Sequence, residues 1–425
     1  MKKSIYILGI CAFSLMQTGC DNYDDLIPQE YNTILSLKEE GEQEVVLYRT
    51  GSDTEFDVTA MKTGSVPTSE AHATLAAMSE AYFERYIQLT GKRYKRLPDD
   101  CFTITGGTMD YGSTDGWKTA KVIVNFEKAA SLVEAEPGNY VIPILLSSET
   151  DSVLSTKCEL LYKMTGVVTP KVSFAGSTSF ELPREGGTID IPLNLQIENQ
   201  WDFTVKVALD AEETTLPGVT LANDGNVTFT SGDNGTLTVN VPPFSSEAIG
   251  DIALRLEGIE GIEFEMQEDG HTVSAALERY PLAVSMLSTN AQEPSEGSLA
   301  NLLDNDPNSY FHSAWSVDIS DMHYVQVTLP EAVQTFSFGY QNRVPNANAA
   351  ICELMLYGGS SENDLEQIRF FPYEELPWNI PAGIFESPTL KLEKPVKVLR
   401  FENYDQRYAN SHFFVWSEFW MRVVN

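Results

Sequence analysis

The strongest constraint on the fold is a strict alternation of apolar and polar residues in the middle of the chain. Residues 189–195 read Ile-Asp-Ile-Pro-Leu-Asn-Leu, and residues 203–209 read Phe-Thr-Val-Lys-Val-Ala-Leu. Successive side chains of a strand point to opposite faces, so each segment buries one face and leaves the other in water. Turn sequences that favour hairpins lie at residues 185–187, 223–225 and 232–235. The pattern predicts an antiparallel β-sandwich over residues 167–281.

The region before this sandwich also has strand patterns, together with one helix pattern. Apolar segments predicted as strands lie at residues 44–48, 55–58, 122–126 and 140–146. Residues 79–89 have the spacing of an amphipathic helix, and its apolar side is predicted to hold Tyr82, Phe83, Tyr86 and Leu89. Core packing of these residues is our expectation, with ligand binding by the tyrosines as the alternative. We interpret residues 34–166 as a separate β-rich domain.

Two cysteines of this first domain leave two interpretations open. Cys101 and Cys158 lie in the same predicted domain. A disulfide between them and two separate buried thiols are both compatible with an oxidising compartment. The cysteine spacing along the chain fits no zinc site.

The first twenty residues have the features of a targeting segment. Lys2 and Lys3 precede an apolar run that is too short to span a bilayer, and Cys20 closes that run after Thr-Gly. This order resembles a bacterial lipoprotein signal, which implies that Cys20 carries a lipid after removal of the preceding residues. The acidic sequence at residues 21–25 resembles the surface-export signal of Bacteroidetes lipoproteins. We expect a lipid anchor at the outer face of the outer membrane, with residues 21–33 as a tether.

The charge of the chain limits its partners. The sequence has 61 acidic and 28 basic residues, which gives a formal net charge of −33. A surface this negative repels phosphate backbones, so we expect no binding to nucleic acid. An acidic glycan is disfavoured for the same reason unless a local basic patch captures it. The sequence lacks Gly-x-Ser-x-Gly, His-Glu-x-x-His and phosphate-loop motifs, and three β-domains leave no length for a catalytic barrel. We therefore expect a binding protein and not an enzyme.

Residues 301–315 place oxygen-bearing side chains immediately before apolar and aromatic ones. Asp304, Asp306 and Ser309 direct oxygens at one centre if the backbone curls between them, and Asn301 adds a main-chain carbonyl. A hard cation such as calcium takes six to eight oxygen ligands of these kinds. The alternative is an ordinary acidic turn, because Asp, Asn and Pro favour turns without any ion.

Further motifs follow this turn in a characteristic order, at residues 323–329, 336–343, 352–358, 398–403 and 416–420. Together they resemble the discoidin domain, or coagulation factor 5/8 type C domain, and the family-32 carbohydrate-binding modules, over the last third of the chain. The resemblance implies a jelly-roll β-sandwich with a structural calcium ion. Its implied calcium ligands are Asn301, Asp304, Asp306, Ser309, Ser417 and Glu418. Asn305 replaces the usual Gly and still tolerates the left-handed backbone conformation. Phe311 stands where the family usually has Trp.

Loop-like segments of the same region hold residues suited to sugars. A sugar presents an apolar C–H face and a rim of hydroxyls, which match aromatic rings and planar hydrogen-bonding groups. The predicted ligand-binding residues are Trp315, Arg343, Asn346, Asn348, Trp378, Tyr404, Tyr408 and His412. Arg343 follows a predicted strand that ends at Tyr340, and the resemblance implies that an Arg in this place and an aromatic in a neighbouring loop hold the sugar. Each has a structural alternative: an ion pair for Arg343, core packing for the tryptophans and a structural role for His412.

The expected architecture is all-β, with two immunoglobulin-like β-sandwiches followed by a discoidin-type jelly roll at residues 282–425. Residues 94–98 and 139–143 resemble a Bacteroidetes lipoprotein domain that commonly precedes discoidin or glycoside-hydrolase modules. The resemblances imply a cell-surface, lipid-anchored carbohydrate-binding protein that captures glycans for an uptake system. An outer-membrane glycan importer is an expected partner. An adhesin or assembly module that binds a protein through the discoidin-like domain is the alternative.

Overall fold

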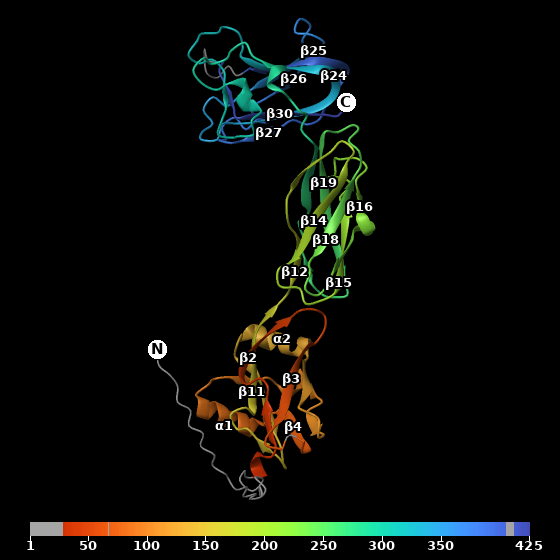
Figure 1. Cartoon of the computed structure of the whole chain (residues 1–425), viewed down its shortest axis with the longest axis vertical. Coiled ribbons are helices and arrows are strands. Elements are labelled where there is room, and N and C mark those ends of the chain that lie inside the picture. The colour runs from red at the N-terminus through yellow and green to blue at the C-terminus, as the bar shows by residue number, and fades with distance from the viewer. Residues whose placement is uncertain (1–28, 67, 405–411) are drawn as a thin grey trace, which may run out of the picture. The chain divides into compact units, whose positions relative to one another are not determined.

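The described chain consists mostly of β-strands in two compact units. The computed structural model describes residues 29–66, 68–404 and 412–425, and the chain divides into its two units at Pro170 (Figure 1). The predicted targeting segment and most of the predicted tether, Cys20 included, lie outside the described residues. The all-β architecture expected from the sequence is confirmed. In the described part of the chain, no helix is long and apolar enough to cross a membrane.

The first unit is a sandwich of two sheets. One sheet has the order β10 (Ser152–Val153), β1 (Ile34–Leu37), β3 (Thr54–Thr63), β8 (Trp117–Val124) and β6 (Phe102–Thr105). The other has the order β2 (Gly41–Tyr48), β11 (Glu159–Val168), β9 (Tyr140–Ser147), β4 (Ala71–Ala77) and β7 (Thr108–Tyr111), with β5 (Lys95–Arg96) beside β9. The sequence of neighbours β1-β3-β8-β6 matches the A-B-E-D sheet of an immunoglobulin domain.

The predicted helix exists, but its buried side is narrower than expected. Helix α1 (Glu80–Thr90) begins where the Ser79 side chain accepts a hydrogen bond from the Tyr82 backbone N–H, and it ends at Gly91 with a left-handed φ of 71°. Phe83 alone is fully buried, whereas Tyr82 is 37% and Leu89 is 77% exposed. The prediction that all four apolar residues pack in the core is therefore wrong. The small cluster beneath the helix accommodates Phe83, with Tyr86 only partly buried against it.

A second helix replaces the end of a predicted strand. Strand β8 stops at Val124, and the side chain of Asn125 accepts a hydrogen bond from the Lys128 backbone N–H to start helix α2 (Phe126–Ala135). Phe126 was expected to continue the strand; instead it begins the buried face of α2. The apolar side chains of α2 recur at helical spacing, which the strand interpretation overlooked. The described cysteines Cys101, Cys158 and Cys352 are all free thiols.

The second unit begins with a sandwich that confirms the alternation pattern; we call β12 to β21 the second sandwich. One sheet has the order β16 (Thr220–Leu221), β18 (Gly235–Val241), β14 (Gly187–Leu195), β12 (Lys171–Phe174) and β20 (Glu265–Met266). The other has the order β13 (Ser179–Leu182), β21 (His271–Leu277), β19 (Ile249–Glu260), β15 (Phe203–Leu209) and β17 (Asn226–Phe229). The apolar residues of 189–195 and 203–207 are buried, as their period of two requires.

The remaining described strands, β22 to β30, form a third β-structure, which we call the jelly-roll domain. Its main sheet has the order β22 (Leu287–Ser288), β24 (Tyr324–Gln341), β28 (Leu390–Asn403), β25 (Leu354–Gly359) and β26 (Glu366–Phe371), and β27 (Ile384–Glu386) and β30 (Glu418–Val423) also pair with β24. A small second sheet joins β23 (Phe311–His312) to β29 (Val415–Trp416). The motifs at residues 323–329 and 336–343 lie mostly on one long strand, because β24 continues through a register irregularity after Thr328.

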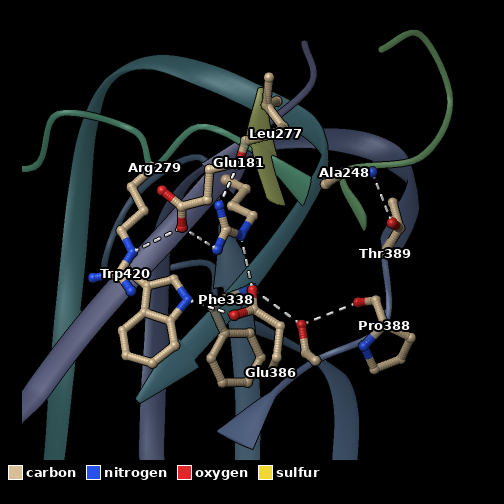
Figure 2. Close-up of polar contacts among 11 residues, drawn as sticks. Glu181, Ala248, Leu277, Arg279, Phe338, Glu386, Pro388, Thr389 and Trp420 are labelled. Carbon is tan, nitrogen blue, oxygen red and sulfur yellow. Dashed lines mark hydrogen bonds and ion pairs between the residues drawn. The ribbon is translucent and has the colours of Figure 1, made fainter. Parts of the chain in front are cut away.

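The second sandwich and the jelly-roll domain are joined by more than their linker. Glu181 and Leu277 of the sandwich lie close to Glu386 and Trp420 of the jelly-roll domain (Figure 2). The side chain of Val424 is buried in the hydrophobic core of the second sandwich, although Val424 follows β30. The second unit thus has two hydrophobic cores and a shared polar junction between them.

Candidate functional site: a loop pocket and an acidic turn

A pocket of about 510 Å³ opens among the loops of the jelly-roll domain; we call it the loop pocket. Its lining comes from the segment after β24, the segment before β27 and the residues around β23 and β29. The lining residues are His312, Arg343, Pro345, Asn346, Ala347, Asn348, Ala349, Ala350, Cys352, Trp378, Asn379, Pro381, Asn403 and Phe413. Four of the predicted ligand-binding residues are among them: Arg343, Asn346, Asn348 and Trp378.

Local hydrogen bonds fix the two loops that form this pocket. The buried Asn342 side chain donates to the carbonyl of Pro377 at 2.6 Å and to that of Ile380 at 3.2 Å, which ties one loop to the other. The Asn346 side-chain oxygen accepts a hydrogen bond from the Asn348 backbone N–H at 3.1 Å. Ala349 has a φ of 60°, a conformation that costs free energy for a residue with a Cβ atom. Strained backbone of this kind is concentrated at ligand sites.

Arg343 is held by an aromatic ring. Its guanidinium carbon lies 4.8 Å from the centroid of the Tyr310 ring, and its Nε is buried without a hydrogen-bond partner among the described residues. The Tyr310 hydroxyl donates to Glu296 at 2.8 Å, and the Trp315 indole N–H donates to the same carboxylate at 2.9 Å. These two hydrogen bonds lower the pKa of Glu296. The arrangement therefore fixes Arg343 from one side and leaves part of its donor capacity for a ligand.

His312 is a pocket residue that the sequence interpretation did not select. Its ring is buried, and Nδ1 lies 2.7 Å from the Ser313 carbonyl oxygen. Since a carbonyl only accepts, Nδ1 donates, and Nε2 of the neutral ring is left as an acceptor. Phe413 packs 5.9 Å from this ring and also lines the pocket. His312 lies within the acidic and aromatic stretch that the sequence singled out, but nothing in that pattern separated it from the core residues beside it.

Three other predicted ligand-binding residues, Trp315, Tyr404 and His412, are not among the residues that line the pocket. Trp315 is 53% exposed, and its contact is with Glu296. Tyr404 packs against Phe370, with ring centroids 5.8 Å apart. His412 lies 6.2 Å from His323. Tyr408 lies outside the described residues.

The acidic turn, residues 301–309, brings several predicted calcium ligands together. The Ser309 hydroxyl donates to Asp304 at 2.7 Å and lies 3.4 Å from the carbonyl oxygen of Asn301. Asn305 has a φ of 58°, so the left-handed conformation expected for this position is confirmed. Asp306 turns one oxygen to Asn308. This geometry leaves the turn as a compact set of hydroxyl, carbonyl and carboxylate oxygens.

Glu418 faces this turn from the start of β30. Its side chain is buried, and its Oε1 has no hydrogen-bond partner in the described structure. Burial, together with the nearby Asp304 carboxylate, raises the pKa of Glu418 to about 7. Ser417 is buried beside it, and its hydroxyl donates to the Asn342 carbonyl.

The donor set of the acidic turn suits a hard cation. The described residues contain no group of three or more His, Cys, Asp or Glu side chains arranged to hold a metal ion. Calcium accepts carboxylate oxygens mixed with hydroxyl and carbonyl oxygens, which are the groups present at this turn. Such an ion would pair with the buried Oε1 of Glu418, which has no hydrogen-bond partner in the described structure.

Comparisons with known proteins match separate parts of the chain. Residues 26–153 match a family model described as a "-like, N-terminal domain", which covers less than half of the chain. No curated protein matches. A family-32 carbohydrate-binding module of a Clostridium perfringens family-31 glycoside hydrolase is 16% identical, with 33% of this chain and 94% of that chain covered and a TM-score of 0.28.

Two Bacteroides fragilis structures are also similar. An F5/8 type C domain is 12% identical over 33% of this chain and 93% of that chain, with a TM-score of 0.26. A two-domain protein of unknown function is 10% identical over 93% of this chain and 95% of that chain, with a TM-score of 0.26.

Proposed function

We propose that the jelly-roll domain binds glycans in the loop pocket. The observation that carries the proposal is Arg343, whose buried Nε has no partner in the described structure. The Tyr310 ring contacts its guanidinium group, and Glu296 fixes the Tyr310 hydroxyl. An unsatisfied buried donor costs about 1–3 kcal/mol, and a ligand that accepts its hydrogen bond recovers this free energy. The pocket is thus prepared for an acceptor group.

The rest of the lining favours a sugar as the source of that acceptor. Asn346, Asn348 and Asn379 provide amide donors and acceptors around the pocket, and Trp378 and Phe413 provide ring faces. Hydroxyl groups match the amides and the guanidinium, and the C–H face of a pyranose matches an aromatic ring. A protein partner would instead require a broad apolar surface. The polar lining of this pocket therefore supports the glycan over the protein alternative.

The acidic turn supports a structural calcium ion within the same proposal. Asn301, Asp304, Ser309 and Glu418 would hold the ion, with Asp306 and Ser417 as the remaining residues of the expected set. The ion would supply positive charge for the orphaned oxygen of Glu418. It would tie the acidic turn to β30 and stabilise the native domain by mass action.

The cellular role that we propose follows from the sequence. Lipidation of Cys20 and the acidic residues after it would display the pocket on the outer membrane, where the protein would deliver glycans to an importer. One or two sugar rings give affinities of roughly millimolar to micromolar, or about −4 to −8 kcal/mol. Many anchored copies on one polymer compensate for this weakness by multivalent binding.

Two experiments test the proposal. A glycan array followed by calorimetric titration of the purified protein should identify a ligand that binds in the loop pocket. Failure to bind any glycan, with circular dichroism showing native structure, would sink the glycan function. Fractionation of cells that carry Cys20→Ala should find the protein in the soluble fraction, and continued membrane association would contradict the anchor.

A further inference from the structure

We propose that the second sandwich and the jelly-roll domain form one rigid body that unfolds as a unit, and that Arg422 is the residue that couples them. Successive side chains of β30 point alternately to two faces. Phe419 and Met421 point into the jelly-roll core, whereas Trp420 and Arg422 point to the opposite face, towards the second sandwich.

Arg422 has acceptors from both structures. Its side chain is only 4% exposed. Nη2 donates to Glu181 of β13 at 2.7 Å, and Nη1 donates to the carbonyl of Leu277 at the end of β21. Nε donates to Glu386 of β27 at 3.0 Å. Each guanidinium nitrogen of Arg422 has an acceptor. A rotation of the second sandwich relative to the jelly-roll domain would break these hydrogen bonds, and water could not replace them because the guanidinium group is buried.

A second group of contacts joins Glu386, Trp420, Arg279 and Glu181 (Figure 2). The Trp420 indole N–H donates to Glu386 at 2.7 Å. Arg279, in the linker after β21, lies 4.3 Å from the Trp420 ring centroid and 3.4 Å from Glu181. The indole packs so closely on β24 that a Cβ atom at Gly339 would approach it to 2.4 Å. The linker is therefore held against the jelly-roll domain instead of serving as a hinge.

Contacts at two further places prevent rotation about this centre. Val424 is buried in the core of the second sandwich. The backbone N–H of Ala248 donates to the Thr389 hydroxyl at 2.9 Å, and Lys391 pairs with Glu247 nearby. Separate domains of a chain usually move relative to each other unless the interface is extensive. Three separate groups of contacts, one of them charged and buried, favour a fixed geometry.

The test is the thermal unfolding of the full chain, followed by calorimetry and by hydrogen exchange of peptides from β19 and β28. In the wild type, both peptides should lose protection in the same transition. In Arg422→Met, the two peptides should lose protection in separate transitions. Arg400→Met is the matched control, because Arg400 stacks on Tyr324 and donates to Gln326 within the jelly-roll domain alone. It should lower the melting temperature without separating the two peptides.

Two outcomes would overturn the proposal. One is a wild-type protein in which β19 and β28 lose protection at clearly different temperatures. The other is a folded Arg422→Met variant in which they still unfold together. If Arg422→Met does not fold, Glu181→Gln replaces it, since this change weakens one of the sandwich's acceptors and keeps the arginine. Glu181→Gln should also separate the two transitions, and unchanged joint unfolding would again overturn the coupling.

Discussion

Two arginines of the jelly-roll domain show opposite uses of the same side chain. Arg422 is buried at the junction, and all three of its guanidinium nitrogens donate hydrogen bonds. Arg343 stacks on Tyr310 at the loop pocket, and its buried Nε has no partner in the described structure. The satisfied arginine stabilises the fold, because removing it takes a hydrogen bond from Glu181, from Glu386 and from the Leu277 carbonyl. The unsatisfied one reduces stability slightly and retains affinity for a ligand.

Glu418 is the acidic counterpart of Arg343. Both side chains have a buried polar atom without a partner among the described residues, and neighbouring groups hold both in place. We therefore expect ligands of this domain to bind where the fold leaves a charged group partly unsatisfied. Side chains whose hydrogen bonds are all satisfied, such as Arg422, stabilise the fold instead.

The largest expected effect is a difference in the free energy of unfolding between variants of the two arginines. Arg422→Met should lower the free energy of unfolding by about 3 kcal/mol, because the buried guanidinium loses three hydrogen bonds, one of them to the partly exposed Glu181. Arg343→Met should change it by less than about 1 kcal/mol, since loss of the contact with Tyr310 offsets removal of the unsatisfied buried Nε. Urea titration of both variants measures the difference. Equal losses would show that the two arginines do not differ in structural role.

The next effect concerns Glu418 and its proposed calcium ion. Saturating calcium at a hundred times its dissociation constant adds about 2.7 kcal/mol of stability, so chelation should lower the melting temperature by roughly 5–10 °C. The second sandwich should shift together with the jelly-roll domain if Arg422 couples them. A melting temperature that chelator does not change would argue against an ion at the acidic turn.

Without the ion, Glu418 should give stability a specific pH dependence. The raised pKa of about 7 means that the native state holds a proton which the unfolded chain releases near pH 4.5. Stability should therefore fall as pH rises from 4.5 to 7, by on the order of 3 kcal/mol in total. In chelator, Glu418→Gln should abolish this fall, and with calcium it should be less stable than wild type. Denaturant titrations between pH 5 and 7.5 decide whether the slope exists.

A smaller effect should appear in glycan affinity. Arg343→Met should weaken binding of the glycan identified on the array by about thirtyfold, or about 2 kcal/mol, because a buried donor to the sugar is lost. Arg400→Met is again the matched control and should bind as wild type. A folded Arg343→Met variant with undiminished affinity would place the contact elsewhere.

The smallest effect should come from the pocket's tryptophan. Trp378 is half-buried at the loop pocket, with its ring 6.4 Å from that of Tyr373. Trp378→Ala should reduce affinity by about fivefold, or about 1 kcal/mol, through lost stacking. Trp315→Ala should reduce affinity less, since the Trp315 indole contacts Glu296 outside the pocket lining and reaches Arg343 only through Tyr310. Titration of both variants with circular dichroism as the folding control tests this ranking.

Local patterns predicted the strands and part of the pocket. The apolar period of two located β14 and β15, and Arg343, Asn346 and Asn348 lie in the loop pocket because they directly follow a strand that ends at its rim. These features are determined by residues that are close in sequence, so they can be predicted from the sequence pattern.

Features that depend on distant contacts were missed or misplaced. Helix α2 was missed because the cap at Asn125 interrupts an apolar run that reads as strand. The orientation of Trp315 depends on Glu296, and the selection of His312 and Phe413 depends on how β23 and β29 pair. The exposure of Leu89 reflects the small size of the cluster below α1. These contacts join residues that are far apart in sequence, so the periodicity of apolar residues does not predict them.

The burial of Val424 has a consequence for the order in which the protein is made. Synthesis proceeds from the N-terminus, so every strand of the second sandwich has left the ribosome long before Val424 has been added. Domains generally begin to fold as they emerge. This sandwich would emerge with a gap in its core, and the gap would be filled only after the jelly-roll domain is nearly complete. Completion of the earlier structure thus waits for the later one, and an interrupted translation product would expose an unfinished apolar core.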